Sequence, residues 1–320
     1  MFRLRALAVV PSFWIGNTCA QDAAFPHRTV QIIVPYSTGT TADILARTLG
    51  PRLAERWKVS VVTDNRPGAT GALGAAAAAK AVPDGHTLLF SAASFAIIPA
   101  LYPSLAFDPV RSFAPVVQLT TSALGLVVHP QVPARTVREL ADLARKRPGE
   151  LFYISAGNGS AQHLVMELFK LETGTQIVHV PYKALSSGFT DLIGGHAQTT
   201  ISTLQTVQGF ASSGRLRLLA VSSAQRAPAF AAVPTFKEQG LALEVETWSG
   251  ALAPAATPRG AITKINNELN ALLDAPELRE SISRQGMSPA GGTPEQFDAL
   301  LKSELTRWAR VVKAAKIRFD

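Results

Sequence analysis

Small hydroxyl residues and a glycine are concentrated between Tyr36 and Thr41, in the order Tyr-Ser-Thr-Gly-Thr-Thr. The segment before them, Val30–Val34, is apolar and β-branched apart from Gln31, which is typical of a strand buried on both faces. After the loop, apolar residues recur at helical spacing from Ala42 to Arg56. A strand, a glycine-bearing loop and a helix N-terminus direct free N–H groups and the positive helix dipole to one place. The segment therefore predicts an anion-binding site.

The same pattern also fits an ordinary strand–helix turn capped by Thr40 or Thr41, because such turns occur throughout α/β proteins. The architecture is repeated further along the chain. An apolar strand at 151–154 leads into the loop Ser155-Ala-Gly-Asn-Gly-Ser160, and a helix is predicted from Ala161 to Leu171. The chain thus carries two hydroxyl- and glycine-rich loops, each in front of a helix.

His163 and Glu167 lie four residues apart on the second of these helices, a spacing that suits a metal pair. No third ligand lies near them in the sequence, so we expect a surface contact or a contact that supports the site instead. No metal and no cofactor are predicted for this chain.

Catalytic signatures are missing from the sequence. There is no Gly-x-Ser-x-Gly elbow, no phosphate-binding loop ending in Gly-Lys-Ser/Thr and no His-Glu-x-x-His. The glycines between Gly68 and Gly74 match a dinucleotide fingerprint only loosely, and we expect them to serve close helix–sheet packing. An exported hydrolase using Ser160 with His163 is the alternative from another class, although no acid is seen to orient the histidine. A ligand-binding protein without enzymatic activity is favoured.

Composition describes a globular chain of 320 residues, with 47% hydrophobic and 17% charged residues, a length that predicts two domains. The formal net charge is +8 and the calculated pI about 9.9. The basic residues are scattered without a run of Lys or Arg, so nucleic acid is not an expected partner.

Residues 1–20 have the features of a secretory signal peptide: Arg3 and Arg5, a short apolar core, and small residues up to Ala20. Cleavage there removes the single cysteine, which suits an oxidising compartment. No later segment is long and apolar enough to cross a membrane. We therefore expect a mature protein that is exported to the periplasm and is not inserted in the membrane.

Strands alternate with helices along the remaining chain, which predicts an α/β fold whose ligand crevice lies beyond the carboxyl ends of the strands. The principal predicted strands are 59–63, 87–90, 114–128, 177–180, 199–204, 216–222 and 245–253. The segments 91–94 and 155–160 are predicted as loops, and the principal later helices as 75–81, 136–146, 258–274 and 293–316. Trp308, on the last of these helices, is expected in the core.

Short motifs spread from about Phe25 to Ile317 resemble the Bug family, the periplasmic solute-binding proteins of tripartite tricarboxylate transporters. The most specific are Ile33-Val-Pro-Tyr-Ser-Thr-Gly39 with Asp43-Ile-Leu-Ala-Arg47, Asn65-Arg-Pro-Gly-Ala69, Pro83-Asp-Gly85, Gly159-Ser160 with His163, Val180-Pro-Tyr-Lys183 and Thr190-Asp-Leu-Ile-Gly-Gly195.

The resemblance implies a two-lobed, type II (Venus flytrap) periplasmic binding protein with two Rossmann-like domains. Lobe 1 would contain 21–121 and 250–320, and lobe 2 would contain 122–249. A small organic acid would be held between the lobes, and transporter subunits would be transient partners of a monomer. The ligand-binding residues implied on this chain are Tyr36, Ser37, Thr38, Gly39, Thr40, Asp43, Ser94, Ser155, Gly157, Gly159, Ser160, His163 and Ser202. Asp43 would act as a clamp on the first loop, and Ser94 as a lateral contact.

Departures from the family pattern bear on the ligand. Thr40 stands where a second glycine is usual, and Gln198 and Ser202 stand where aspartates are common. Loss of a carboxylate beside the ligand argues against an amino acid and for a small acid, including an aromatic one. A receptor that presents its ligand to a signalling sensor, instead of a permease, remains an alternative.

Overall fold

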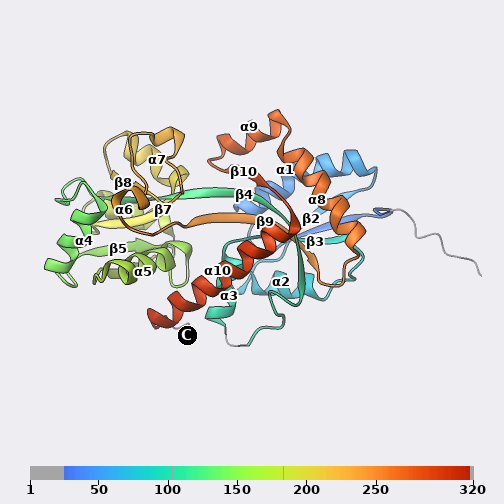
Figure 1. The fold of residues 1–320 in the computed structure, drawn as a ribbon, viewed down its shortest axis with the longest axis horizontal. Coiled ribbons are helices and arrows are strands. Elements are labelled where there is room, and N and C mark those ends of the chain that lie inside the picture. The colour runs from blue at the N-terminus through green and yellow to red at the C-terminus, as the bar shows by residue number, and fades with distance from the viewer. Residues whose placement is uncertain (1–24, 103, 183, 318–320) are drawn as a thin grey trace, which may run out of the picture.

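The computed structural model describes residues 25–102, 104–182 and 184–317. The predicted signal peptide lies outside these residues. The fold is mixed α/β: its strands form one curled sheet with the path β2-β1-β3-β9-β4-β7-β5-β6, to which β8 and β10 are added through β4. Figure 1 shows two groups of elements at the two ends of the molecule, joined by long strands.

The first group is built from the two ends of the chain. Its strands are β1 (Val30–Val34), β2 (Val61–Asn65), β3 (Thr87–Ala92), β9 (Glu246–Pro254) and β10 (Ser288–Gly291). Its helices are α1 (Thr41–Trp57), α2 (Ala72–Ala79), α3 (Ser94–Leu101), α8 (Arg259–Leu273), α9 (Pro276–Arg284) and α10 (Pro294–Ala314), with a 3-10 turn at Ala69–Gly71.

The second group is formed by the middle of the chain. Its strands are β5 (Phe152–Ser155), β6 (Val178–Pro181), β7 (Thr199–Thr203) and β8 (Arg217–Val221). Its helices are α4 (Val137–Lys146), α5 (Ala161–Thr173), α6 (Leu185–Ile193) and α7 (Leu204–Ser212), with 3-10 turns at Pro228–Phe230 and Lys237–Gln239.

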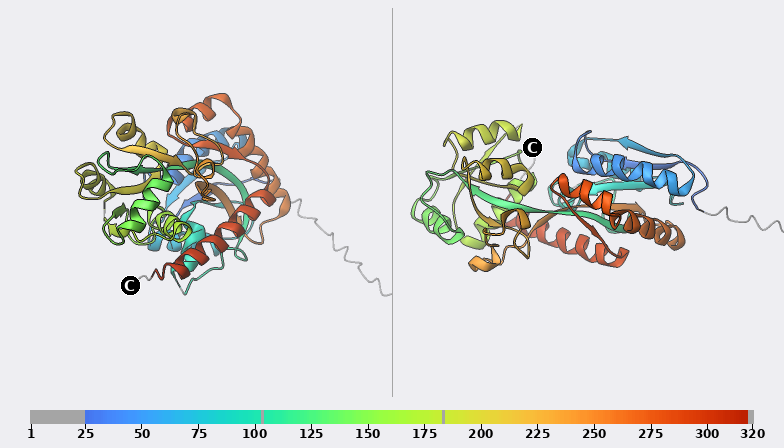
Figure 2. Two further views of the ribbon diagram at one scale, coloured as in Figure 1. Left: turned by 60° about the vertical axis from the view of Figure 1, so that its left-hand side comes forward. Right: turned by 90° about the horizontal axis from the view of Figure 1, so that it is seen from above.

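Strand β4 (Phe113–Val128) belongs to both groups. Its residues 113–123 pair with β9, and its residues 124–128 pair with β7 and β8. The prediction of one long strand at 114–128 is therefore confirmed. The view from above in Figure 2 follows this strand from one group into the other. Helix α10 adds a second connection, because Arg310 forms an ion pair with Glu172 of α5 at 3.0 Å.

The pairing register shows where the parallel strands end. Strand β3 reaches Ala92 opposite Ser249, which is paired with Thr120 of β4. Strand β7 approaches from the other direction and ends at Thr203 opposite Leu124. The two points, Thr120 and Leu124, are four positions apart along β4, or about 13 Å at the usual rise of an extended strand. The carboxyl ends of the parallel strands in the two groups therefore point toward each other.

Several helix and strand boundaries differ from those predicted. The prediction of a loop at Ser91–Ser94 is wrong. Ser91 and Ala92 extend β3, where they pair with β9, and Ser94 begins α3. Pairing with β9 therefore overrides the loop-like composition of this segment. Leu204 likewise begins a helix instead of ending a strand.

Glycine at 74 is required by packing, as the sequence suggested. A Cβ atom at this position would lie 2.7 Å from both the Arg66 carbonyl oxygen and Pro35. The chain after β2 therefore lies directly against the end of β1, where the first hydroxyl loop begins. Trp308 is 2% exposed and confirms the prediction that it belongs to the core.

Candidate functional site

Loop 36–41 connects the end of β1 to α1, at the edge of the first group that faces the second. Ser37, Thr38 and Gly39 are exposed, whereas Tyr36 is half-buried. Gly39 has φ +86°, a conformation that a residue with a side chain adopts at a cost. Since no atom lies within 4 Å of the Cβ position of Gly39, backbone conformation and not crowding requires the glycine.

Asp43 holds this loop from inside the first turn of α1. Its carboxylate accepts hydrogen bonds from the Gly39 N–H at 2.8 Å, from Asn65 Nδ2 at 2.9 Å and from Arg47 Nε at 2.9 Å. Burial by itself raises the pKa of the Asp43 carboxyl, but these hydrogen bonds and the charge of Arg47 outweigh it and keep the pKa below its usual value. The contact with Gly39 is the one that a loop clamp requires.

Tyr36 turns its hydroxyl toward the first group. Its Oη lies 2.9 Å from Ser91 Oγ and 2.7 Å from Ser94 Oγ, and it accepts the Ala92 N–H at 3.3 Å. Burial raises the pKa of Tyr36 above its usual value. Ser94 is thus joined to loop 36–41 through Tyr36.

Helix α1 begins without a side-chain cap. Thr40 Oγ1 donates to the Ser37 carbonyl and accepts no helix N–H. Within the described residues, the N–H groups of Thr41, Ala42 and Asp43 have no acceptor. Such groups form an anion-binding position at the positive end of a helix dipole.

Loop 156–160 stands at the corresponding place in the second group, between β5 and α5, and Ser155 is the last residue of β5. Gly157 has φ +102° and Gly159 has φ +71°. The Gly159 N–H donates to His163 Nδ1 at 3.0 Å, and the Gly157 N–H donates to Ser155 Oγ at 3.1 Å. Both amides are therefore directed into the loop itself.

Ser160 caps α5, because its Oγ accepts the His163 N–H at 3.3 Å and donates to the Gly157 carbonyl at 2.8 Å. The Nδ1 atom of His163 is occupied by Gly159, so Ser160 and His163 do not form the side-chain pair that a serine nucleophile needs. The N–H groups of Ala161 and Gln162 find no acceptor among the described residues.

His163 and Glu167 are both buried, which excludes the surface contact and leaves the other predicted alternative, a contact that supports the loop. Glu167 accepts hydrogen bonds from Tyr153 Oη and Lys170 Nζ, both at 2.6 Å. No group of three or more His, Cys, Asp or Glu side chains suited to a metal ion occurs within 25–102, 104–182 and 184–317.

Ser202 lies near the carboxyl end of β7, paired with Gly125 of β4. Its hydroxyl is buried and has no hydrogen-bond partner in the described part of the chain. Thr200, two residues earlier, is also buried but donates to the Ile154 carbonyl at 2.7 Å. An unpartnered buried hydroxyl is costly, and the described residues show no compensating contact for it; the prediction that Ser202 contacts a ligand stays a prediction.

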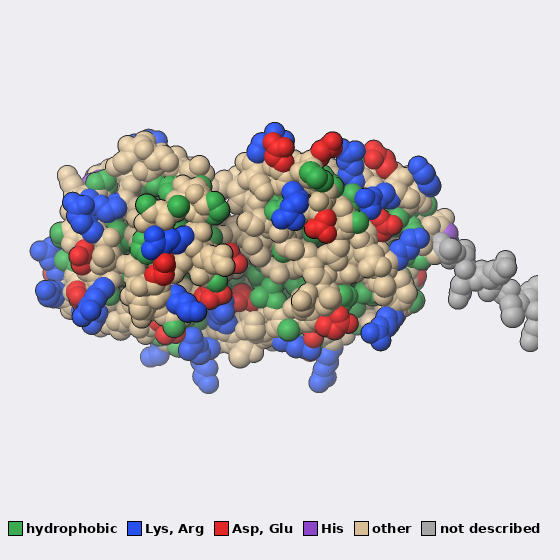
Figure 3. All heavy atoms as spheres, turned by 45° about the horizontal axis from the view of Figure 1, so that its top comes forward, with side chains coloured by type: hydrophobic (Ala, Val, Ile, Leu, Met, Phe, Trp, Pro, Cys, Tyr) green, Lys and Arg blue, Asp and Glu red, His purple; other side chains and the backbone are tan. Residues whose placement is uncertain are grey.

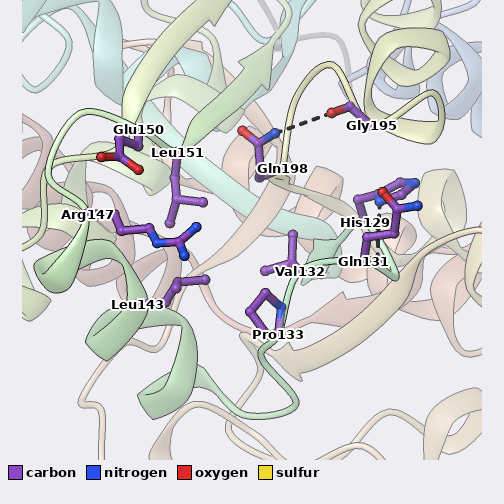
Figure 4. A pocket seen from close by; sticks show the side chains of 10 residues that line it. All are labelled: His129, Gln131, Val132, Pro133, Leu143, Arg147, Glu150, Leu151, Gly195 and Gln198. Atoms are coloured by element: carbon purple, nitrogen blue, oxygen red, sulfur yellow. Dashed lines mark hydrogen bonds between the residues drawn. The ribbon is translucent and has the colours of Figure 1, made fainter.

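A separate pocket of about 220 Å³ opens at the outer end of the second group, on the loop after β4, α4 and the turn before β7. Figure 4 shows Arg147 extending into it between Leu143 and Leu151, with His129 and Gln131 on the opposite side. None of the predicted ligand-binding residues lines this pocket.

Sequence reasoning missed His179 of β6, whose Nε2 lies 2.5 Å from Ser155 Oγ. An isolated histidine in a short strand carries no motif, and only its position beside β5 brings it to the loop. None of the helices in the described ranges combines the length and the apolar character needed to cross a bilayer.

A family model described as the tripartite tricarboxylate transporter family receptor matches residues 45–317. Protein BugT of Bordetella pertussis is 35% identical over 315 residues, covering 97% of this chain and 97% of BugT. Two solved structures from Rhodopseudomonas palustris are also similar. Rpa4515 with adipate is 34% identical, has a TM-score of 0.77 and covers 92% of this chain and 99% of that one. MatC with bound malate is 28% identical, has a TM-score of 0.73 and covers 90% of this chain and 100% of that one.

Proposed function

The chain belongs to the tripartite tricarboxylate transporter receptor family, and from this premise we propose that it is a periplasmic receptor that carries a small organic carboxylate to a membrane transporter. Its role is to bind, without catalysis, and its contact with the transporter subunits is transient. Adipate and malate in two solved relatives support a carboxylate as the ligand class.

One observation carries the proposal. Helix α1, after loop 36–41, has no side-chain cap, and helix α5, after loop 156–160, is only partly capped. The parallel strands of the two groups have carboxyl ends that point toward each other. Five N–H groups at these helix starts have no protein acceptor among the described residues. A charge-assisted hydrogen bond contributes about 1.5–3 kcal/mol. Four of them sum to about 6–12 kcal/mol, a range that includes the roughly 8 kcal/mol of a micromolar site before ordering costs are subtracted.

We place lobe 1 at 21–121 and 250–320, lobe 2 at 122–249, and the hinge at Thr120–Gly125 and Thr247–Gly250. Support comes from β4, which changes partners between residues 123 and 124. Closure about this point brings the two loops together around the ligand. Each chain supplies both loops, so the proposed site needs no second copy, and we propose a monomer.

A thermal-shift panel of residues 21–320 tests the ligand class, using di- and tricarboxylates, aromatic acids and amino acids. Carboxylates are expected to raise the melting temperature, because a ligand that binds only the folded state stabilises it. Stabilisation by amino acids alone would refute the carboxylate assignment. Native mass spectrometry of protein purified without added solute then identifies the ligand that the cell supplies.

Ser202→Ala and Thr200→Val form a matched pair for the ligand contact. Ser202→Ala removes a buried hydroxyl without a protein partner, so we expect a melting temperature without ligand that is equal or higher and a smaller shift with the bound acid. Thr200→Val removes a satisfied hydrogen bond, so it lowers the ligand-free stability by about 1 kcal/mol. Equal ligand shifts in Ser202→Ala and the unmodified protein would remove Ser202 from the site.

A further inference from the structure

Three aromatic rings are stacked beneath loop 156–160. The rings of His163 and His179 are 3.9 Å apart between centroids and 8° from parallel, and the ring of Tyr153 lies beside both, 4.8 Å from His179 and 6.4 Å from His163. They come from three elements, α5, β6 and β5. The two imidazoles therefore share one face in the interior of the second group.

This stack holds the loop at two points. His163 Nδ1 accepts the Gly159 N–H, and His179 Nε2 contacts Ser155 Oγ. That serine hydroxyl in turn accepts the Gly157 N–H. The directions of the Gly157 and Gly159 amides, and with them the path of the chain into α5, depend on the two rings.

The hydrogen bond to Gly159 fixes the protonation state of His163. A backbone N–H can only donate, so Nδ1 must present its lone pair and the neutral ring must carry its proton on Nε2. An added proton would sit on Nδ1, directly against the Gly159 N–H. Two cationic rings at 3.9 Å would also repel each other, so the pair titrates as a coupled unit.

Among the charged groups around the stack, Glu167 favours protonation of His163 and Lys170 opposes it. On α5, Glu167 is already paired with Lys170 and Tyr153, and β7, which packs on α5, has no titratable residue. From α10, Arg310 is paired with Glu172. Burial lowers the pKa of His163, with Glu167 opposing and Lys170 adding to it. Burial, followed by His163 and Lys170, lowers the pKa of His179 to about 3.

We propose that His163 and His179 are positioning residues that hold loop 156–160 in its acid-binding form only while both rings are neutral. Protonation of His163 releases the Gly159 amide and weakens ligand binding, a consequence that rests on the proposed receptor function. The structural part of the inference concerns the loop alone and is testable without a ligand.

The first experiment is NMR of the ligand-free protein with ¹⁵N-labelled histidine and glycine. We expect the Nε2–H form of His163 at pH 7.5, a titration midpoint below that of an ordinary histidine, and a Gly159 amide signal that moves with the same midpoint. Titration of His163 in the ordinary range, with the Gly159 signal unmoved, would overturn the proposal.

Two substitutions at His163 distinguish the role of its hydrogen-bond acceptor from the role of its bulk. His163→Asn places an amide oxygen close to the position of Nδ1 and does not titrate, whereas His163→Leu offers bulk without an acceptor. In the asparagine variant the Gly159 amide should stay protected and become independent of pH. In the leucine variant its hydrogen exchange should be at least tenfold faster. Identical Gly159 behaviour in both variants would contradict a positioning role.

The effect on ligand binding is tested with adipate as the probe, and its affinity is measured by calorimetry at pH 7.5. Affinity should remain within threefold of the unmodified protein in His163→Asn and fall at least tenfold in His163→Leu. Unweakened binding in His163→Leu would overturn the link between ring and ligand. Failure of adipate to bind the unmodified protein would count against the proposed ligand, while the Gly159 measurements would still decide the positioning claim.

Discussion

The two hydroxyl loops share one construction but differ in the side chain that secures it. In each, a glycine with positive φ donates its N–H to the side chain four residues later, Gly39 to Asp43 at 2.8 Å and Gly159 to His163 at 3.0 Å. In loop 36–41 the acceptor is an anion supported by Arg47 and Asn65. In loop 156–160 it is a neutral ring within an aromatic stack.

This difference gives the loops different dependences on acid. Both acceptors have a lowered pKa, so both contribute stability above the pKa of the unfolded chain and lose it as the pH falls toward the lower folded value. For His163 that loss begins below about pH 6.5, and for Asp43 below about pH 4. Mild acid therefore acts on the second loop while it leaves the first intact.

The helix starts differ as well. Helix α5 has a side-chain cap from Ser160, whereas the hydroxyl of Thr40 is turned back to Ser37. The first loop consequently leaves one more N–H group without a protein acceptor than the second. We infer that α1 supplies the larger share of the electrostatic attraction for an acid.

Asp43→Ala, in the first loop, should cause the largest loss of stability. It leaves the Gly39 N–H without its acceptor and removes one of the two acceptors of Asn65 Nδ2, which also donates to the Tyr36 carbonyl, so the free energy of unfolding should fall by about 2–4 kcal/mol. Urea denaturation at pH 7.5 measures this loss. Asp43→Asn is the control, since it keeps one acceptor and removes the charge, and its loss should be about half as large. Equal losses would mean that the carboxylate acts through charge and not as the acceptor for Gly39.

Acidification should have an intermediate effect. Between pH 6.5 and 5.5 the free energy of unfolding should fall, by no more than about 1.4 kcal/mol for each histidine held neutral. His86 contributes in the same range, because burial lowers its pKa too. The slope for His163→Asn should therefore be smaller than that of the unmodified protein but not zero. Superimposable slopes would show that the second loop is not the acid-sensitive one.

Removing the hydroxyl that precedes each helix should have the smallest effect on the free energy of unfolding. Ser160→Ala deletes a hydroxyl that accepts the His163 N–H, at a cost of about 1 kcal/mol in unfolding free energy. Thr40→Ala removes no helix cap and should cost less than about 0.5 kcal/mol. Thermal or urea unfolding of both variants checks the order, and a larger loss from Thr40→Ala would reverse our assignment of which helix is capped.

The sequence was most informative where local chemistry alone determines structure. The strand at Val30–Val34 is predicted without error because its β-branched run ends at a proline, and β4 because its apolar run is long. The family and the α/β fold also follow from motifs that the chain retains.

Contacts between distant segments were not visible in the sequence. Ser91 and Ala92 have the composition of a loop, yet pairing with β9 makes them strand. His163 has no neighbouring motif that shows its burial, and His179 reaches it only because β6 pairs with β5. Likewise, the unpartnered hydroxyl of Ser202 depends on which side chains surround β7, which no local pattern records.

Strand β4 has a consequence for attempts to divide the protein. Because one continuous strand completes the sheets of both halves, a gene fragment that encodes either half alone must omit part of its backbone pairing. Each fragment would expose unpaired strand edges, which favour aggregation. Complementation from two separately expressed pieces should therefore succeed only if one piece retains the whole of residues 113–128.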